Sequence, residues 1–426
     1  AERLSRMSGR SDRFADLSTG LAELGCEALL VLARTAQEPD LAPFVGAVHL
    51  GECQLVAPRE GTAHLAYFTP MERDEAAATG FALLTPEALD LTRWASEAPE
   101  PADFLARVTA KSLELLGIAP GRLALAGYGQ AGVIVAACNR LAKDGWTFVP
   151  GNGLVLAVRK RKTATELAAI RAASDATCAA MRAVASLLAA ATVRDDQTLE
   201  LDGEALKVAR LRDEVAKVLS HHGCEQPKGN IIAPAEEGGV PHSTGTQDRV
   251  LRAGESLIVD LYPRGTLWSD CTRTFCVCAP SETLRHAWTA VRDALETAHL
   301  RVAPGVRGWD LQEVICALFE ERGYATPISQ PGTTTGYVHN LGHGVGFDIH
   351  EQPIFKKVSG AEGVLSEGDV FTLEPGLYDP TPPPPDTGYG VRLEDLVWLG
   401  PDGVESLTPL PYDLDPRAWS RSEAQS

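Results

Sequence analysis

Between positions 339 and 350 the chain reads His339-Asn-Leu-Gly-His343-Gly-Val-Gly-Phe-Asp-Ile-His350, with three histidines in twelve residues. On a helix, the spacing of His339 and His343 would place both imidazoles on one face, as in the zinc proteases. Each glycine in this run weakens a helix by about 1 kcal/mol, and no apolar stripe of helical period offsets that loss. We therefore predict strand and turn, where glycine lets other backbone or a ligand approach closely. Histidines so placed suggest a metal or catalytic site if carboxylates join them.

Suitable carboxylates lie in four apolar, strand-like runs. Asp260 ends the run Ser256-Leu-Ile-Val-Asp260, and Asp270 begins the β-branched stretch Asp-Cys-Thr-Arg-Thr-Phe. Glu374 closes a strand before a Pro-Gly turn, and alternation puts Glu394 on the same strand face as Arg392. A lone buried carboxylate costs several kcal/mol unless it is paired or bound to a metal. These acids and a histidine would satisfy one another around divalent ions.

The order and spacing of these motifs resemble a known family, the prolidase and aminopeptidase P branch of the pita-bread metallopeptidases. The matching stretches are Asp260, Asp270-Cys-Thr-Arg-Thr, His339-x3-His343-Gly-Val-Gly-x3-His350-Glu351, Thr372-Leu-Glu374-Pro-Gly-Leu-Tyr378 and Val391-Arg392-Leu-Glu394-Asp395. The resemblance covers residues 157–412 strongly and the earlier residues more loosely. It implies an α/β N-terminal domain like that of creatinase and prolidase, followed by an α+β pita-bread catalytic domain.

The resemblance also implies roles for individual residues. Two divalent metal ions would be held by Asp260, Asp270, His343, Glu374 and Glu394, with Asp270 and Glu394 bridging the ions. His242 would be the substrate-side histidine, and His339 and His350 would flank the reacting carbonyl. Arg392 matches the arginine two residues before the last ligand.

A site with four carboxylates and one imidazole is rich in hard oxygen ligands, which suits Mn²⁺, with Co²⁺ or Zn²⁺ as substitutes. Two such ions can lower the pKa of a shared water, and the resulting hydroxide would attack a peptide carbonyl. His350 or His242 would donate to the oxyanion, and Glu374 would carry the proton to the leaving nitrogen. Arg392 would hold in place either Glu394 or an acid outside the set of metal ligands.

The leading hypothesis is therefore a dinuclear metallopeptidase, prolidase-like or aminopeptidase P-like, that hydrolyses short peptides at Xaa-Pro bonds. Two departures from the family bear on which peptide end is gripped: Asp260-Leu-Tyr-Pro-Arg264 replaces Asp-x-Gly-Ala, and residues 379–390 contain four consecutive prolines, which favour a stiff extended arm. The first alternative is a carboxypeptidase-type relative, with that arm or Arg264 holding a free carboxylate. The second is a non-catalytic or metal-free, creatinase-like relative, although all five implied ligands are present.

Composition is that of an ordinary soluble protein, with 44% hydrophobic and 23% charged residues. A net charge of −18 disfavours nucleic acid and anionic membranes as partners. No apolar run approaches the length of a membrane span, and the first residues lack the hydrophobic core of a signal peptide. The nine cysteines form no C-x-x-C pair, so a zinc knuckle or redox motif is not expected. Their odd number argues against a full disulfide framework, and we therefore expect a cytoplasmic protein. The resemblance favours a homodimer.

Two domains are expected, 1–156 for assembly and lining the entrance, and 157–426 for catalysis, with Pro150-Gly-Asn-Gly as the boundary signal. The first domain alternates helix and strand, which suggests a sheet covered by helices, and it carries no complete dinucleotide fingerprint. In the second, Thr163-x-x-Glu166 is a capping box that opens a long helix. Further helices are expected at about 203–222, 282–302 and 310–322, and the tail after Pro411 is expected to fray.

Overall fold

The computed structural model describes residues 2–381 and 388–422. The chain forms two compact units, Ala1–Arg159 and Lys160–Ser426. The division lies after residue 159, where the sequence suggested residue 156. The roles assigned to the two domains stay predictions.

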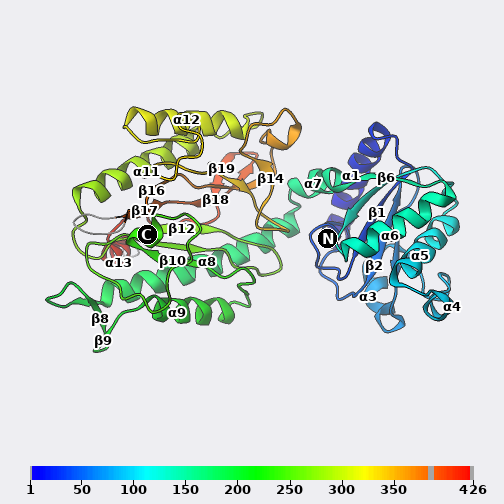
Figure 1. Ribbon diagram of the computed structural model, residues 1–426, viewed down its shortest axis with the longest axis horizontal. Coiled ribbons are helices and arrows are strands. Elements are labelled where there is room, and N and C mark those ends of the chain that lie inside the picture. Colours follow the sequence, from blue (N-terminus) through cyan, green and yellow to red (C-terminus); the bar gives the residue numbers. More distant parts are fainter. Residues whose placement is uncertain (1, 382–387, 423–426) are drawn as a thin grey trace. The chain divides into compact units, whose positions relative to one another are not determined.

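The first unit is built on a mixed six-stranded sheet with strand order β4-β3-β2-β1-β5-β6. β1 pairs antiparallel with β2 and parallel with β5. Apolar side chains of α1 and α7 pack on one group of strand residues, and those of α5 and α6 pack on another, so the sheet is covered by helices as expected (Figure 1). The elements are β1 Ala28–Ala33, β2 Cys53–Pro58, β3 His64–Tyr67, β4 Ala82–Leu84, β5 Arg122–Gly127, β6 Thr147–Pro150, α1 Glu2–Glu23, α5 Pro101–Leu115, α6 Ala131–Leu141 and α7 Asn152–Lys160.

Two helix pairs frame the second unit. One pair is α8 (Ala164–Ala190) with α9 (Val208–His221), and the other is α11 (Glu282–Arg301) with α12 (Gly308–Glu321). The expected capping box opens α8, because Thr163 accepts from the backbone N–H of Glu166 while the Glu166 carboxylate accepts from the Thr163 N–H. Each pair packs its apolar face on the central strands, which lie between the pairs (Figure 1).

Three of the sheets in the second unit converge on the predicted site residues. The first has the order β10-β11-β12, the second β14-β13-β15-β18-β19, and the third is the hairpin β16-β17. β11 and β12 are buried along their whole length, so an acid placed on either strand needs a partner. The strands are β10 Ile231–Pro234, β11 Leu257–Leu261, β12 Cys271–Phe275, β13 His343–Gly344, β14 Glu351–Ile354, β15 Val370–Leu373, β16 Gly376–Asp379, β17 Tyr389–Arg392, β18 Asp395–Gly400 and β19 Gly403–Ser406.

The glycine-rich run adopts strand and turn, as its glycine content predicted. A Cβ added at Gly342 would lie 2.0 Å from the carbonyl oxygen of Thr372, and one added at Gly344 would lie 2.0 Å from that of Gln352. Neighbouring backbone therefore occupies the space that any side chain would need. The glycines allow β13 to sit between β14 and β15, with His343 at its start.

The prediction of a frayed C-terminal tail is wrong. Residues Pro416–Ser422 form the helix α13, and Trp419 is buried against Phe275, with ring centroids 5.0 Å apart. A single large aromatic side chain buries enough area to dock an otherwise polar segment. The proline-rich arm cannot be assessed, since residues 382–387 lie outside the described part of the chain.

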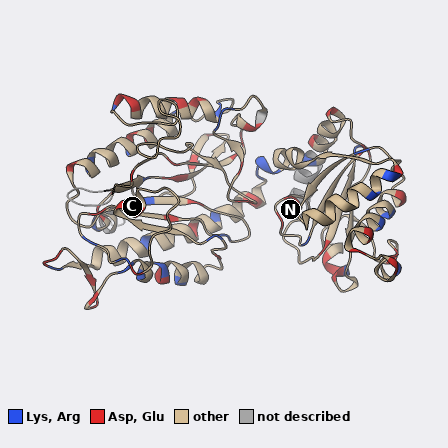
Figure 2. Ribbon diagram, viewed as in Figure 1, with Lys and Arg blue, Asp and Glu red and all other residues tan. Residues whose placement is uncertain are grey.

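The acidic excess lies largely on the surface. Figure 2 shows Asp and Glu recurring along the outer helices α11 and α12. Among residues 2–381 and 388–422, none of the helices combines the length and apolar character needed to cross a membrane.

Candidate metal centre

Asp270, His343 and Glu394 form a cluster suited to a metal ion. Each offers one ligand atom, and these atoms lie within 4.8 Å of one another. Asp270 immediately precedes β12, His343 begins β13, and Glu394 sits in the short connection between β17 and β18. Three segments far apart in sequence therefore deliver polar groups to one point between the sheets.

Glu374 and Asp260 complete the group of acids. Glu374 follows β15, and its Oε1 lies 3.5 Å from Nε2 of His343. Asp260 lies on β11 directly opposite Thr272 of β12, and its charge raises the pKa of Asp270, Glu374 and Glu394. The structure thus brings the five predicted ligands together, while their role as ligands stays a prediction.

The electrostatics of this cluster favour bound cations. Burial first, and then the neighbouring acids, raise the pKa of Asp270 and of Glu394 well above the usual range. Burial raises the pKa of Glu374 to about 8; Arg392 opposes that shift and Asp260 adds to it. Burial, followed by the charge of His350, lowers the pKa of His343 to about 3. Buried carboxylates that repel one another beside a neutral imidazole are stabilised by divalent cations.

Two carboxylate oxygens lack protein partners, which also fits a metal site. Among the described residues, Oδ1 of Asp260 and Oδ1 of Asp270 are buried and have no hydrogen-bond partner. Unpaired buried oxygens of this kind call for an ion or a similar partner. His343 agrees, because its Nδ1 lies 3.2 Å from the carbonyl oxygen of Gly344. A proton held there leaves the lone pair of Nε2 directed at the acids.

Arg392 and Thr272 hold the acids in place. The Arg392 guanidinium donates from Nη2 to Asp260 at 2.6 Å and from Nε to the Thr272 hydroxyl at 3.1 Å. That hydroxyl in turn donates to Oε2 of Glu394 at 2.7 Å. We expected Arg392 to hold Glu394 or an acid outside the ligand set, and the structure differs. The acid that Arg392 contacts is Asp260, itself a proposed ligand, and Arg392 reaches Glu394 only through Thr272.

A hydrogen-bond chain joins His339 to the same arginine. Nδ1 of His339 lies 2.7 Å from the carbonyl oxygen of Asn340, so the proton belongs on Nδ1 and Nε2 accepts from the Tyr378 hydroxyl at 2.7 Å. The Tyr378 oxygen accepts from Nη1 of Arg392 at 2.9 Å. Burial, and then the charge of Arg392, lower the pKa of His339 to about 3. The imidazole is therefore neutral at physiological pH.

The other two predicted histidines lie at the exposed edge of the site. His350 packs edge-on against His343, with ring centroids 4.2 Å apart. His242 is exposed, and its charge lowers the pKa of both His339 and His350. The charge of Asp260 acts on His350, so this side chain lies close enough to the acids to meet a bound molecule.

Sequence reasoning missed the partners that connect these groups. Tyr378 and Thr272 both belong to the quoted motifs, but neither carries a metal-binding or titrating signal at neutral pH. The buried pair of Arg273 and Asp395, described below, was missed as well. The available signal was position alone, since each residue stands within four positions of a predicted ligand. Asp395 is next to Glu394, Thr272 and Arg273 follow Asp270 by two and three positions, and Tyr378 follows Glu374 by four.

Comparison with known proteins agrees with the fold. A prolidase from Pyrococcus horikoshii superposes with a TM-score of 0.71, covering 95% of this chain and 99% of that one at 22% identity. The dipeptidase PepE from Mycobacterium ulcerans gives a TM-score of 0.72 over 96% and 97% of the two chains, also at 22% identity. The predicted architecture, an α/β domain followed by a pita-bread domain, is confirmed.

The fold and the acid cluster together define the class of metallopeptidases. Residues 168–401 match the model of metallopeptidase family M24, and the chain belongs to that family. In sequence, a Xaa-Pro dipeptidase from Pyrococcus furiosus is 32% identical over 233 residues, covering 53% of this chain and 61% of that protein. The chain spans about half to three-fifths of the length of the first curated relatives it matches.

Proposed function

We propose that this protein is a metal-dependent peptidase that hydrolyses short peptides, foremost at Xaa-Pro bonds. The observation that carries the proposal is the convergence of three buried acids, the partly buried Glu374 and one neutral histidine, with unpaired oxygens on Asp260 and Asp270. The similarity to a Xaa-Pro dipeptidase and to a prolidase supports the choice of bond.

The ligands we propose are Asp260, Asp270, His343, Glu374 and Glu394, holding two divalent ions. Mn²⁺ suits this oxygen-rich set best, and Co²⁺ or Zn²⁺ would be accepted. When bound, the ions would supply Lewis-acid activation of the peptide carbonyl and of a water nucleophile near neutral pH.

Glu374 is the group we assign to proton transfer. Its carboxylate lies at the cluster, with Oε1 3.5 Å from Nε2 of His343, and a carboxylate so placed can act as a general base. It would accept the proton of the attacking water and deliver it to the nitrogen of the leaving group. For an Xaa-Pro bond that nitrogen belongs to a tertiary amide, so the transfer must accompany its departure.

The histidines would divide the remaining work. His350 and His242, exposed at the edge of the site, are placed to donate to the oxyanion of the tetrahedral intermediate, worth about 3–4 kcal/mol for one good donor. Both ring nitrogens of His339 are already engaged, by Asn340 and by Tyr378. We therefore assign His339 to fixing Tyr378 and Arg392, which in turn hold Asp260.

A peptide-library digest read by mass spectrometry, with and without a chelator, tests this function. We expect cleavage at Xaa-Pro bonds that stops on chelation and returns with Mn²⁺. End-blocked peptides separate the alternative activities. Cleavage of an N-acylated peptide, together with loss of activity on a C-amidated peptide, would exclude an aminopeptidase and favour a carboxypeptidase. Less than one ion per chain after Mn²⁺ loading would favour a non-catalytic or metal-free relative. The homodimer and the cytoplasmic location stay predictions.

A further inference from the structure

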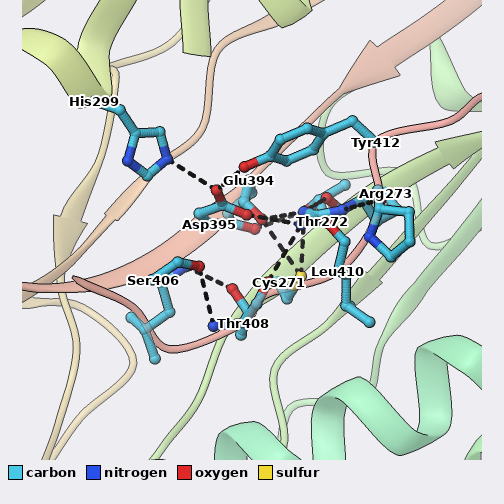
Figure 3. Close-up of polar contacts among 12 residues, drawn as sticks. Cys271, Thr272, Arg273, His299, Glu394, Asp395, Ser406, Thr408, Leu410 and Tyr412 are labelled. Atoms are coloured by element: carbon cyan, nitrogen blue, oxygen red, sulfur yellow. Dashed lines mark hydrogen bonds and ion pairs between the residues drawn. The ribbon is translucent and has the colours of Figure 1, made fainter. Parts of the chain in front are cut away.

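Behind the acid cluster lies a second polar network, centred on Asp395. Its carboxylate is fully buried and accepts three hydrogen bonds, from Arg273 Nη2 at 2.7 Å, His299 Nε2 at 2.9 Å and the Tyr412 hydroxyl at 2.5 Å. Figure 3 shows these three side chains pointing at Asp395 from different parts of the unit. His299 comes from α11, Arg273 from β12 and Tyr412 from the segment before α13. None of the four is a proposed ligand.

Arg273 connects this network to the proposed ligand Glu394. Its Nη1 donates to the carbonyl oxygen of Glu394 at 2.6 Å and to that of Thr272 at 2.9 Å. Its remaining donors go to the carbonyl oxygens of Thr408, Leu410 and Pro411. The guanidinium is 1% exposed, and Asp395 is the only carboxylate that pairs with it in the described part of the chain.

The backbone of Glu394 is consequently held from both sides. Its carbonyl accepts from Arg273, and its N–H donates to the carbonyl oxygen of Thr272 at 3.0 Å. Its side chain accepts from the hydroxyl of Thr272. Glu394 lies in the connection between β17 and β18, which belong to different sheets. The inter-strand hydrogen bonds of these sheets therefore do not fix its backbone. Arg273 and Thr272 supply that restraint instead.

Fold stability alone is a weak reason for such a network. Burying an ion pair costs desolvation that the mutual attraction only partly returns, and apolar replacements are often as stable. Removing one partner, in contrast, leaves an unpaired buried charge. This network includes Asp395, the residue next to the proposed ligand Glu394, which gives it a second use. Residues that hydrogen-bond to metal ligands set the orientation of those ligands and the affinity for the metal.

We propose that Asp395, His299 and Tyr412 form a positioning unit that orients Arg273 and, through it, fixes Glu394 for metal binding. The inference rests on the proposed function, since it requires Glu394 to be a ligand. His299 and Tyr412 both donate to Oδ2 of Asp395 and thereby fix the orientation of the carboxylate. The other oxygen, Oδ1, is then free to accept from Arg273 and to align its guanidinium. Loosening either outer contact lets Arg273 rotate and releases the carbonyl oxygen of Glu394.

The test compares Mn²⁺ dissociation constants, by calorimetry, for the purified 426-residue chain and four variants. Tyr412→Phe removes one hydroxyl and keeps the ring that packs over Arg273. His299→Leu removes the second donor, and His299→Gln restores one. Asp395→Asn removes the charge. We expect Asp395→Asn to weaken Mn²⁺ binding about 10–100-fold, the range for lost outer partners. Tyr412→Phe and His299→Leu should give smaller losses, with His299→Gln recovering part of the affinity.

Leu295→Ala is the matched control. Leu295 lies one turn before His299 on α11 and is buried in the apolar core, and its apolar side chain cannot hydrogen-bond to Asp395. This variant should lower the melting temperature without changing the Mn²⁺ dissociation constant of the folded protein. The absorption spectrum of the Co²⁺-loaded protein gives an independent readout, since a displaced Glu394 changes the geometry around the ion.

The outcomes separate the inference from the function on which it rests. If the wild-type chain binds no Mn²⁺, the proposed function fails and this inference with it. If the wild type binds Mn²⁺ but Tyr412→Phe and His299→Leu bind it equally well and only melt earlier, as Leu295→Ala does, the network is structural and the inference is wrong. Should Asp395→Asn not fold, the two outer variants still decide the question.

Discussion

Chelating bound metal should leave this protein less stable at pH 8 than at pH 6.5. Without cations, burial keeps a proton on Glu374 up to a pKa of about 8, whereas the same side chain in the unfolded chain releases its proton near 4.5. Between these values the folded state binds more protons than the unfolded state. Its free energy of unfolding therefore falls as the pH rises.

The size of the effect follows from the number of protons held. One extra bound proton changes the free energy of unfolding by about 1.4 kcal/mol per pH unit, which gives about 2 kcal/mol over about 1.5 units. Because the Glu374 side chain is 18% exposed, water screens part of this, and we expect a loss of about 1–2 kcal/mol from Glu374. Asp270 and Glu394, with pKa values raised in the same direction, add to the loss.

The histidines act in the opposite sense and at lower pH. His339 and His343 have pKa values lowered to about 3, so below pH 6.5 the unfolded chain binds protons that the folded chain does not. Their contribution to stability is present above pH 6.5 and is lost as the pH falls towards 3. The interval from pH 6.5 to 8 therefore isolates the carboxyl groups.

Urea unfolding in a chelator at the two pH values, followed by fluorescence, measures the difference. Glu374→Gln is the matched variant, since glutamine keeps the shape but does not titrate, and its dependence on pH should be shallower than that of the wild type. Saturating Mn²⁺ should reverse the sign, because deprotonated ligands bind the ion more tightly. Equal metal-free stability of the wild type at both pH values, or the same slope for Glu374→Gln, would refute the reasoning.

Other substitutions probe single contacts. Glu394→Ala should abolish both metal retention and turnover, and wild-type turnover in that variant would rule out its role as a bridging ligand; metal content per chain and peptide hydrolysis measure this. Tyr378→Phe should lower kcat by weakening the hold of Arg392 on Asp260 while leaving KM nearly unchanged, and steady-state kinetics would show the reverse if Tyr378 contacts substrate. Gln312→Leu should lower the free energy of unfolding by about 1–3 kcal/mol in urea titrations, because it leaves the buried N–H of Leu341 without its acceptor; an unchanged midpoint contradicts this.

The sequence predicted those features that depend on local pattern or on composition. Acids in apolar runs, such as Asp260 in a strand buried on both faces, need partners wherever the strand lies. The capping box at Thr163 and the span of α11 depend on residues that are close in sequence, so they can be predicted without knowing the tertiary structure. The glycine content of the run before His350 excluded a helix for a local reason too.

Partners far apart in sequence could not be predicted. Alternation in a strand tells which face a side chain occupies, but it does not tell which distant residue lies opposite. Arg273 and Asp395 are 122 positions apart in sequence. They meet because β12 and β18 both lie beside the short connection that carries Glu394. His299 reads as an ordinary residue in the last turn of a helix. Trp419 was overlooked for the opposite reason, since a single aromatic in a polar segment gives no periodic signal.

The acceptors of Arg273 have a consequence for how the protein is made. Three of them are the carbonyl oxygens of Thr408, Leu410 and Pro411, and Tyr412 follows directly. A ribosome has to translate past residue 411 before this guanidinium can be satisfied. All five proposed ligands, from Asp260 to Glu394, have been translated by then. Completion of the proposed metal centre is thereby tied to synthesis of the segment after β19, and chains that stop before that segment should lack the restraint on Glu394.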